Sequence, residues 1–581
     1  MSIAGELERA RHLAFADDHG AARDLLVSLM PQIVELDRDD LALEVFAQLG
    51  EIHLVRTAYD AVAESVRRIR DCVSVYQQIR AGMLPDTATQ VTLDDTVVGE
   101  MIVRYTRRAD FLEIGLAATS GDHSAAATGL AALIRESDLG GEPALADELL
   151  QLIARARIIC ATALSDDDDH VAAEPLWDAV LTVLDDRDQT VAADHLWILT
   201  GIGYGRFCVE TGRVENAEPH LQRASARAER RGWQLASARA GLERAAAAWA
   251  RSDHPETERL VAVAYPPIAA HAIAHDVSRC WLYLGLTRMA TGGLAAADEC
   301  WEQAQKHWTE LGNPLHIHRI ILQRSWIDIF RGRFDAARER VAQARELLDS
   351  APRSSWLQYA RLDDLLGTIW RAEALSDMGF DGAGDPDADW HELEDRLAGS
   401  RGITTAPDGS PGYVSAMTKF ERAAELKIPA ALAVDSVRHT LTDADARWRW
   451  TRAVSAPLLA GAFAVAWEWE NVDLVAQLVE YHSARGTFAT ADEPGVVDDW
   501  AVAATAATPS VDATRELAMT AAGPDAPVDG APASSLTRSG PLPPIRMDPT
   551  GSPVLEHYRR LAEARYGRVV TSAEPAWTTW P

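Results

Sequence analysis

Apolar and small residues recur at intervals of 40 between about Ile198 and Trp356. Five such series stay in register over four successive units, and an internal period of this kind indicates a repeated supersecondary unit. The series are Ala217, Thr257, Ala297, Ala337; Leu221, Val261, Trp301, Val341; Ala224, Ala264, Ala304, Ala344; Ile202, Leu242, Leu282, Leu322; and Gly205, Ala245, Gly285, Ser325.

Each unit is predicted to be a helical hairpin. Ile202 and Gly205 belong to its first helix, and the stripe Ala217, Leu221 and Ala224 follows the i, i+4, i+7 spacing of a second helix. Small residues let the two helices approach closely, and the large residue of the stripe fills the gap. The turn falls at Gly212, Ser252, Gly292 and Gly332. Because one hairpin cannot bury its apolar face alone, we expect each to stack on the next.

The clearest unit reads Trp281-x-x-Leu284-Gly285, followed by Ala297-x-x-x-Trp301. It resembles the tetratricopeptide repeat (TPR) pattern W-x2-L-G … A-x3-F. Arg288 stands where that family prefers Tyr, and the period exceeds the usual 34 residues, so the chain is similar to the longer-helix members. The resemblance implies an all-α, right-handed solenoid that binds peptides or partner proteins, and it implies no chemistry.

Four segments are predicted along the chain: degenerate helical repeats in 1–160, the TPR-like repeat core in 161–375, a divergent helical cap in 376–487, and a Pro/Ala-rich linker with a tail helix in 488–581. Leu366-Gly367 keeps the first-helix signature, but the partner helix is displaced beyond two Gly-rich loops, Gly379–Asp389 and Ser400–Gly412. The expected cap helices are Tyr413–Leu426, Pro429–Thr440, Asp443–Trp469 and Val472–Ala484.

The tail is predicted to contain one short helix, Pro553–Tyr566, with Val554, Tyr558, Leu561 and Arg565 on one face. The preceding stretch is rich in Ala, Pro, Thr, Gly and Asp, and much of it should lack a core of its own. A tail with aromatic residues after such a stretch either docks back on its own chain, the interpretation we favour, or engages a partner.

A second resemblance concerns the C-terminal third. The segments Pro429–Arg438, Trp448–Trp469 and Pro541–Pro581 are similar to parts of actinobacterial repeat proteins, some of which carry or neighbour caspase-like CHAT peptidase domains. The His and Cys motifs of that peptidase do not occur here. This resemblance therefore implies the repeat part or a partner of such a system, not the protease.

Composition narrows the classes of partner. Lys and Arg total 56 against 87 Asp and Glu, a net charge of −31, which disfavours nucleic acid and anionic membranes. Five scattered cysteines without a CxxC pair indicate free thiols in a reducing cytosol. Met1–Gly20 lacks the features of a signal peptide, and the longest charge-free apolar run, Ala453–Trp467, is too short to span a bilayer. We therefore expect a cytoplasmic protein.

Candidate chemistry is sparse, and we expect no catalytic residue, metal or cofactor. The sequence contains no Walker A loop, HExxH or GxSxG. His271 and His275 are an i, i+4 pair that suits a metal, although helix-face histidines near a turn explain them equally well. The run Asp385–Asp389 imitates the start of a calcium loop, but Trp390 occupies the position that requires glycine.

A peptide-binding groove is the better supported site. Arg239, Arg279 and Arg319 lie 40 residues apart, each three residues before a repeat leucine. Arginines beside large apolar side chains can hold the carboxylates and apolar groups of an extended peptide. The alternative is that these arginines pair with Asp and Glu of neighbouring helices. The further groove candidates on the same side of successive first helices are Arg206, Trp249, Met289 and Trp326.

The expected function is a non-enzymatic scaffold or adaptor that binds a protein or peptide. The alternative is a regulatory or sensor subunit that controls a partner effector such as a CHAT-type peptidase. The sequence names no partner.

Overall fold

The structure is a computed structural model that describes residues 2–84, 91–138, 145–167, 169–184, 189–271, 274–310, 312, 314–351, 354–379, 406–439, 444–484, 543–547, 550–573 and 575–578. Within these residues nearly every element is a helix. The chain divides into two compact units, Met1–Tyr283 (unit 1) and Leu284–Pro581 (unit 2), and each is described by itself. A division at this point, inside helix α14, was not among the boundaries predicted from the sequence.

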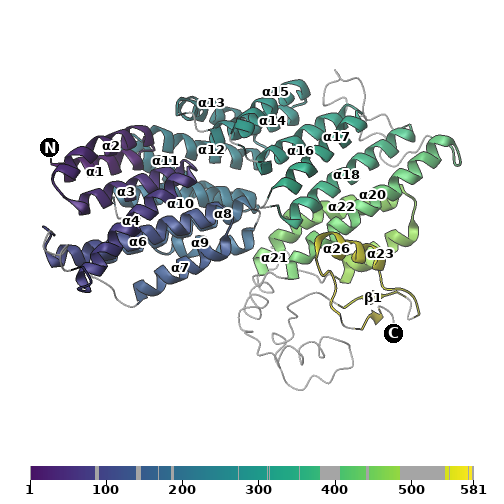
Figure 1. Cartoon of the computed structure of the whole chain (residues 1–581). Helices are drawn as coiled ribbons and strands as arrows, with labels where there is room; N and C mark the ends of the chain where they lie inside the picture. The colour runs from purple at the N-terminus through teal and green to yellow at the C-terminus, as the bar shows by residue number, and fades with distance from the viewer. Residues whose placement is uncertain are drawn as a thin grey trace. The chain divides into compact units, whose positions relative to one another are not determined.

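Unit 1 is an array of helix pairs, in which each first helix packs against the second helix that follows it (Figure 1). Each second helix of four of these pairs also contacts the first helix of the next pair: α2 on α3, α4 on α6, α7 on α8, and α11 on α12. The pairs are α1 Ile3–Phe15 and α2 His19–Glu35, α3 Asp39–Val55 and α4 Tyr59–Arg80, α6 Asp95–Thr119 and α7 His123–Asp138, α8 Ala146–Asp166 and α9 His170–Leu181, α10 Val191–Glu210 and α11 Val214–Arg231, and α12 Gln234–Ala250 and α13 His254–Ala270. Helix α14, Ala274–Ala290, follows.

A residue in the left-handed backbone region ends many of these helices, and it recurs every 20 residues. The predicted turn positions Gly212, Ser252, Gly292 and Gly332 all have positive φ, between 61° and 85°. The same conformation occurs at Asp17, Asp37 and Thr57, so the 20-residue spacing also governs the N-terminal helices. Aspartates after several of these turns cap the next helix: Asp18 and Asp253 each accept a backbone N–H from three residues further on.

The repeat series predicted from the sequence form the contacts between paired helices. All members of the three second-helix series are at most 2% exposed. A Cβ added at Gly205 would lie 2.6 Å from Leu221 Cδ2, and one at Gly285 would overlap the Trp301 indole. The glycine of the first helix therefore admits the large residue of the second, as predicted. The chain is an all-α protein of paired helices consistent with a helical repeat.

The first helices of unit 1 form a closed ring. Helix α1 packs on α3, α3 on α6, α6 on α8, α8 on α10, and α10 returns to α1. Phe15 of α1 closes the circuit by stacking on His195 of α10, with ring centroids 4.2 Å apart. We call these five helices the inner ring.

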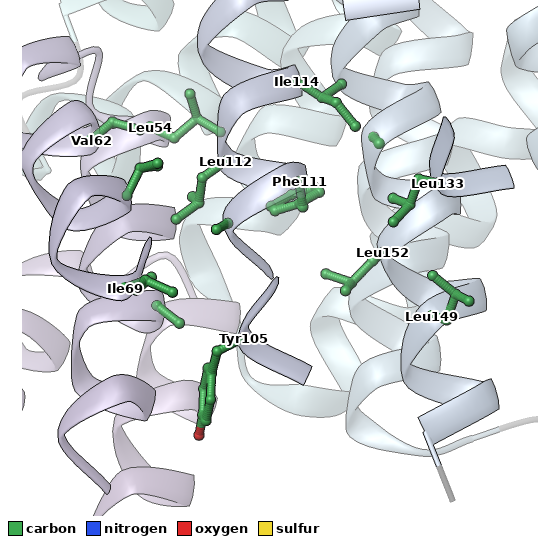
Figure 2. Packing of buried hydrophobic residues seen from close by; sticks show 14 of the residues in the cluster. Leu54, Val62, Ile69, Tyr105, Phe111, Leu112, Ile114, Leu133, Leu149 and Leu152 are labelled. Carbon is green, nitrogen blue, oxygen red and sulfur yellow. The ribbon is translucent and has the colours of Figure 1, made fainter. Parts of the chain in front are cut away.

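Helix α6 lies between two neighbouring pairs and joins their cores. Figure 2 shows Leu112 on the side of Leu54, Val62 and Ile69, whereas Phe111 faces Leu133 and Leu152 on the other side. Burying side chains of this size contributes about 1.5–3 kcal/mol each, so neighbouring pairs stabilise one another.

Unit 2 continues with α15 Leu294–Glu310, α16 Pro314–Phe330, α17 Phe334–Ser350 and α18 Trp356–Asp377. The partner of α18 is displaced in the sequence, as predicted, and is α20, Pro411–Ser436. The buried Lys427 joins the two helices, because its Nζ donates to Asp364 Oδ1 at 2.7 Å and to Thr368 Oγ1 at 2.8 Å. Gly367 and Gly461 leave room for its stem.

Two predictions about the cap helices were wrong. The helices expected at Tyr413–Leu426 and Pro429–Thr440 are one continuous helix, with Pro429 in its interior. The expected helix Asp443–Trp469 is α21 Ala444–Trp450, a π-helical turn Thr451–Ser455 and α22 Ala456–Glu468. Helix α23, Val472–Ala484, matches its prediction, and the short 3-10 helix Val437–His439 ends α20. Most of the predicted linker 488–552 lies outside the described residues.

The tail docks back on unit 2, the outcome favoured from the sequence. Helix α26, Glu556–Tyr566, packs on α18 and α20, and strands β1 Ile545–Arg546 and β2 Trp577–Thr578 form a short parallel pair. Its buried face is Leu555, Arg559, Ala562 and Tyr566, one position later than predicted for most members, because Leu555 adopts φ 53° and turns the chain before the helix begins. Within the described residues, no helix has the length and apolar character that crossing a membrane requires.

Candidate binding face and the charges of the inner ring

The seven predicted groove residues fall on consecutive first helices, as expected, but in two units. Arg206 lies on α10, Arg239 and Trp249 on α12, and Arg279 on α14, all in unit 1. In unit 2 the remaining three are partly buried, with Met289 on α14 and both Arg319 and Trp326 on α16. The indole of Trp326 lies 6.1 Å from the ring of Phe330.

Arg279 forms a two-pronged ion pair with Glu243 of the preceding first helix. Its Nη2 donates to Glu243 Oε2 at 2.7 Å, and its Nη1 donates to the other carboxylate oxygen. Both side chains are at least 91% buried, and the guanidinium lies 5.9 Å from the centre of the Tyr283 ring. Burial lowers the pKa of Arg279, but Glu243 outweighs this effect and raises the pKa well above its usual value. Trp249 lies beside this pair, with its ring 6.4 Å from that of Tyr283.

The two other arginines of unit 1 are also paired. Arg239 Nε lies 2.9 Å from Asp276 Oδ2, and its Nη1 lies 3.7 Å from Asp17 at the α1–α2 turn. Arg206 donates to Asp166 at 2.6 Å and to Glu210 at 2.8 Å. Burial would raise the pKa of Asp276, but Arg239 and then His275 lower it instead. All three arginines thus have the intramolecular partners that the alternative interpretation anticipated, and peptide binding by them stays a prediction.

The sequence analysis missed a second set of charged residues, inside the inner ring. Arg108 of α6 donates to Glu44 at 2.9 Å and to Glu51 at 2.6 Å, both on α3. Arg11 of α1 pairs with Glu44 at 2.7 Å, and Arg155 of α8 pairs with Glu51 at 2.8 Å. We call these five residues the ring ion pairs. They join four of the five inner helices through charge-assisted hydrogen bonds.

The ring ion pairs shift the acidity of both glutamates. Burial would raise the pKa of Glu44, but Arg108 and Arg11 lower it to about 2. The same happens at Glu51, where Arg155 and Arg108 lower the pKa to about 2. One signal could have revealed them: Glu44, Gln48 and Glu51 follow the i, i+4, i+7 spacing inside an otherwise apolar helix.

A pocket of about 240 Å³ opens beside the ring ion pairs, between α1, α3 and α6. Arg11, Glu44 and Tyr105 form part of its wall, and Tyr105 Oη donates to Glu44 Oε2 at 3.1 Å. The remaining lining is Ala4, Leu7, Glu8, Asp40, Leu41, Val97, Glu100, Met101 and Arg104. Its charged groups largely pair with each other or with neighbouring helices.

The other candidate chemistry is reported residue by residue. His271 Nδ1 lies 2.8 Å from Pro267 O, and His275 Nδ1 lies 3.0 Å from Asp276 Oδ1. In the described ranges, no three His, Cys, Asp or Glu side chains gather as a metal site would require. The calcium-like run Asp385–Asp389 lies outside those ranges. All five cysteines are free thiols, as predicted, and burial raises the pKa of Cys280 to about 12 and of Cys160 to about 11.

No protein-family model and no curated protein matches this chain.

Proposed function

We propose that this chain is a non-enzymatic, TPR-like scaffold that binds a protein or peptide partner in the cytoplasm. One observation carries the proposal: four predicted groove residues from three consecutive first helices gather in one cluster. Arg206 and Arg239 both lie close enough to Arg279 and Glu243 for these charges to influence their pKa values. Trp249 and Tyr283 add aromatic surface beside them. We call this cluster the binding face.

The charge pattern defines the chemistry of the ligand. Each arginine of the binding face already has a carboxylate partner, so a peptide carboxylate must take over one side of an existing pair. Arg239 is the best placed for this exchange, because its side chain is 28% exposed, against 13% for Arg206 and 9% for Arg279. An extended peptide with an acidic group next to an apolar side chain fits this arrangement, with the apolar side chain against Trp249.

The test is partner capture from the native host with matched variants. Arg239→Ala and Trp249→Ala alter the binding face, whereas Arg259→Ala removes an exposed arginine of α13 that pairs only locally with Glu256. Quantitative mass spectrometry should find a partner retained by the wild type and by Arg259→Ala and lost by both face variants. Equal retention by all four proteins would contradict the face, and recovery of no partner would contradict the scaffold.

A charge exchange separates binding from folding at Arg279. Arg279→Glu alone places two carboxylates together and should unfold part of unit 1. The double variant Arg279→Glu with Glu243→Arg restores the ion pair. If Arg279 only holds α12 to α14, the double variant regains both its melting temperature and its partner. If Arg279 contacts the ligand, we expect only the melting temperature to recover.

The docked tail favours a second candidate, a regulatory subunit whose state controls an effector such as a CHAT-type peptidase. That link rests on the resemblance of the C-terminal third. A change in the activity of the captured partner on addition of this chain supports the regulatory role, and unchanged activity supports the scaffold.

A further inference from the structure

Residues 543–570 bind to unit 2 in the way a helical ligand binds to a groove. Val554, Leu555, Ala562, Tyr566 and Val570 are all buried in one cluster. The cluster also contains Leu357 and Ala360 of α18 and Ala424 and Ile428 of α20. Figure 1 shows α26 beside α20 and α23. Since α18 and α20 pack extensively on each other, the surface that receives the tail does not depend on the tail for its main support.

Polar contacts at both ends of the tail helix fix its position. The backbone N–H of Leu555 donates to Gln477 Oε1 of α23 at 2.8 Å. Eleven residues later, Tyr566 Oη donates to Asp363 Oδ2 of α18 at 2.6 Å, in a buried setting. His557 Nε2 lies 2.6 Å from Glu425 Oε1 at the exposed rim. The surface thus recognises an apolar residue before the helix, a tyrosine at its end and a positive charge beside it.

Pro429 supplies one further contact for the tail. A proline inside a helix has no N–H, so the carbonyl four residues earlier loses its usual donor. Here that carbonyl belongs to Glu425, and it accepts a hydrogen bond from Arg565 Nη1 at 2.5 Å. The interruption in the hydrogen bonds of α20 therefore becomes an acceptor for the docked segment.

The fit of the tail has one defect, at Arg559. This side chain is 8% exposed on the buried face of α26, and its Nε has no hydrogen-bond partner. Among the residues that the structure describes, no carboxylate forms an ion pair with it. A buried charge without a partner weakens an interface. Desolvation accordingly lowers the pKa of Arg559.

We propose that the surface of α18, α20 and α23 is an exchangeable binding site for an amphipathic helix, and that residues 543–578 are its resident ligand. The occupant is the chain's own tail, and the same segment from a second copy, or supplied as a peptide, takes its place. The apolar residue, the tyrosine and the basic residue at the positions of Leu555, Tyr566 and Arg565 define what the site accepts. This inference concerns unit 2 and does not depend on the binding face of unit 1.

Peptide exchange on a cleaved full-length chain tests the proposal. A specific protease sequence placed between residues 510 and 511 allows the chain to fold whole and then to be cut. The tail fragment should stay bound in gel filtration. A fluorescent peptide of residues 543–578 should then replace it, to a limit of one per chain, and should enter the uncut chain far less because the tethered tail competes at a high local concentration. Failure of the peptide to enter the cut chain over days would overturn the proposal.

Variant peptides test the details without altering the folded protein. Leu555→Asp should abolish entry, and Tyr566→Phe should weaken binding about 2- to 12-fold, the range for one hydrogen bond. Arg559→Leu should bind more tightly than the natural sequence. Entry of the Leu555→Asp peptide as readily as the natural one would overturn the site as described.

A double-mutant cycle tests the contact made possible by Pro429. In the chain variant Pro429→Ala, the Glu425 carbonyl regains a helical donor. The natural peptide should then lose affinity about 2- to 12-fold, whereas an Arg565→Ala peptide should bind both chains alike. Equal losses for both peptides would show that Pro429 acts through the shape of α20 and not through Arg565.

Discussion

Arg108 holds two carboxylates inside the inner ring. It is 4% exposed and bonds to both Glu44 and Glu51. Replacing it with alanine leaves part of two buried charges without a partner, so we expect a loss of about 3–5 kcal/mol in the free energy of unfolding. Arg70→Ala is the matched control, because Arg70 pairs with Asp110 and Glu113 at the surface and should contribute at most about 1 kcal/mol. Urea unfolding of both variants measures the difference, and equal losses would contradict the role given to burial.

The same residues predict the response to acid. Glu44 and Glu51 have pKa values of about 2 in the fold against an ordinary value of 4.5. Their stabilising contribution is complete above pH 4.5 and is lost as the pH falls toward 2, because the unfolded chain takes up protons that the folded chain refuses. Two such groups give a slope of at most about 2.7 kcal/mol per pH unit. In Glu51→Gln we expect about half that slope. An unchanged slope in urea unfolding between pH 5 and 3 would contradict the shifted pKa values.

At the level of elements, close approach of paired helices depends on small residues at fixed positions. Gly285 faces Trp301, and a methyl group there would overlap the indole. We expect Gly285→Ala to cost about 1–3 kcal/mol, the range for overpacking. Gly241→Ala is the control, because its new Cβ would lie 3.8 Å from Ala264, an ordinary contact, and alanine favours the helix by about 1 kcal/mol. Thermal unfolding should place the two variants on opposite sides of the wild type.

The sequence predicted the helix pairs where glycine and alanine mark the period, and it was less informative elsewhere for physical reasons. Asp17, Asp37 and Thr57 adopt the left-handed turn conformation that glycine advertises, so the 20-residue spacing of the N-terminal helices was hidden. Pro429 was taken as a helix boundary, but a buried cluster and an outside donor to Glu425 keep α20 continuous. Leu555 shifted the buried face of the tail helix through its backbone conformation.

The candidate site was predictable in position but not in partners. Arg206, Arg239 and Arg279 lie on neighbouring helices because the 40-residue period places them there. Which carboxylates meet them depends on packing between helices, and Asp17 reaches Arg239 only because the inner ring closes. No local pattern in the sequence encodes a contact over 222 positions.

At the scale of the whole molecule, unit 1 gains a constraint that an open array of repeats lacks. Helix α1 returns to α10, and Phe15 stacks on His195 there. Desolvation and the nearby Arg155 lower the pKa of His195 to about 3, so this histidine is neutral near pH 7 and the stack carries no buried charge.

Opening the ring should therefore be felt far along the chain. We expect Phe15→Ala to cost about 1–3 kcal/mol, less than the loss for a fully buried phenylalanine. It should also speed amide hydrogen exchange in α10 as well as in α1. Val27→Ala, a change at an exposed position of α2, should leave both helices unchanged. Faster exchange confined to α1 would contradict the closed ring.

The central claim is that aligned first helices present a surface for a protein partner. The most direct measurement is the affinity of the captured partner for the wild type, Arg239→Ala, Trp249→Ala and Arg259→Ala, by isothermal titration calorimetry. We expect the two changes in the binding face to weaken the complex at least about tenfold, which corresponds to roughly 1.4 kcal/mol, while Arg259→Ala binds as the wild type does. Four equal affinities would contradict the account.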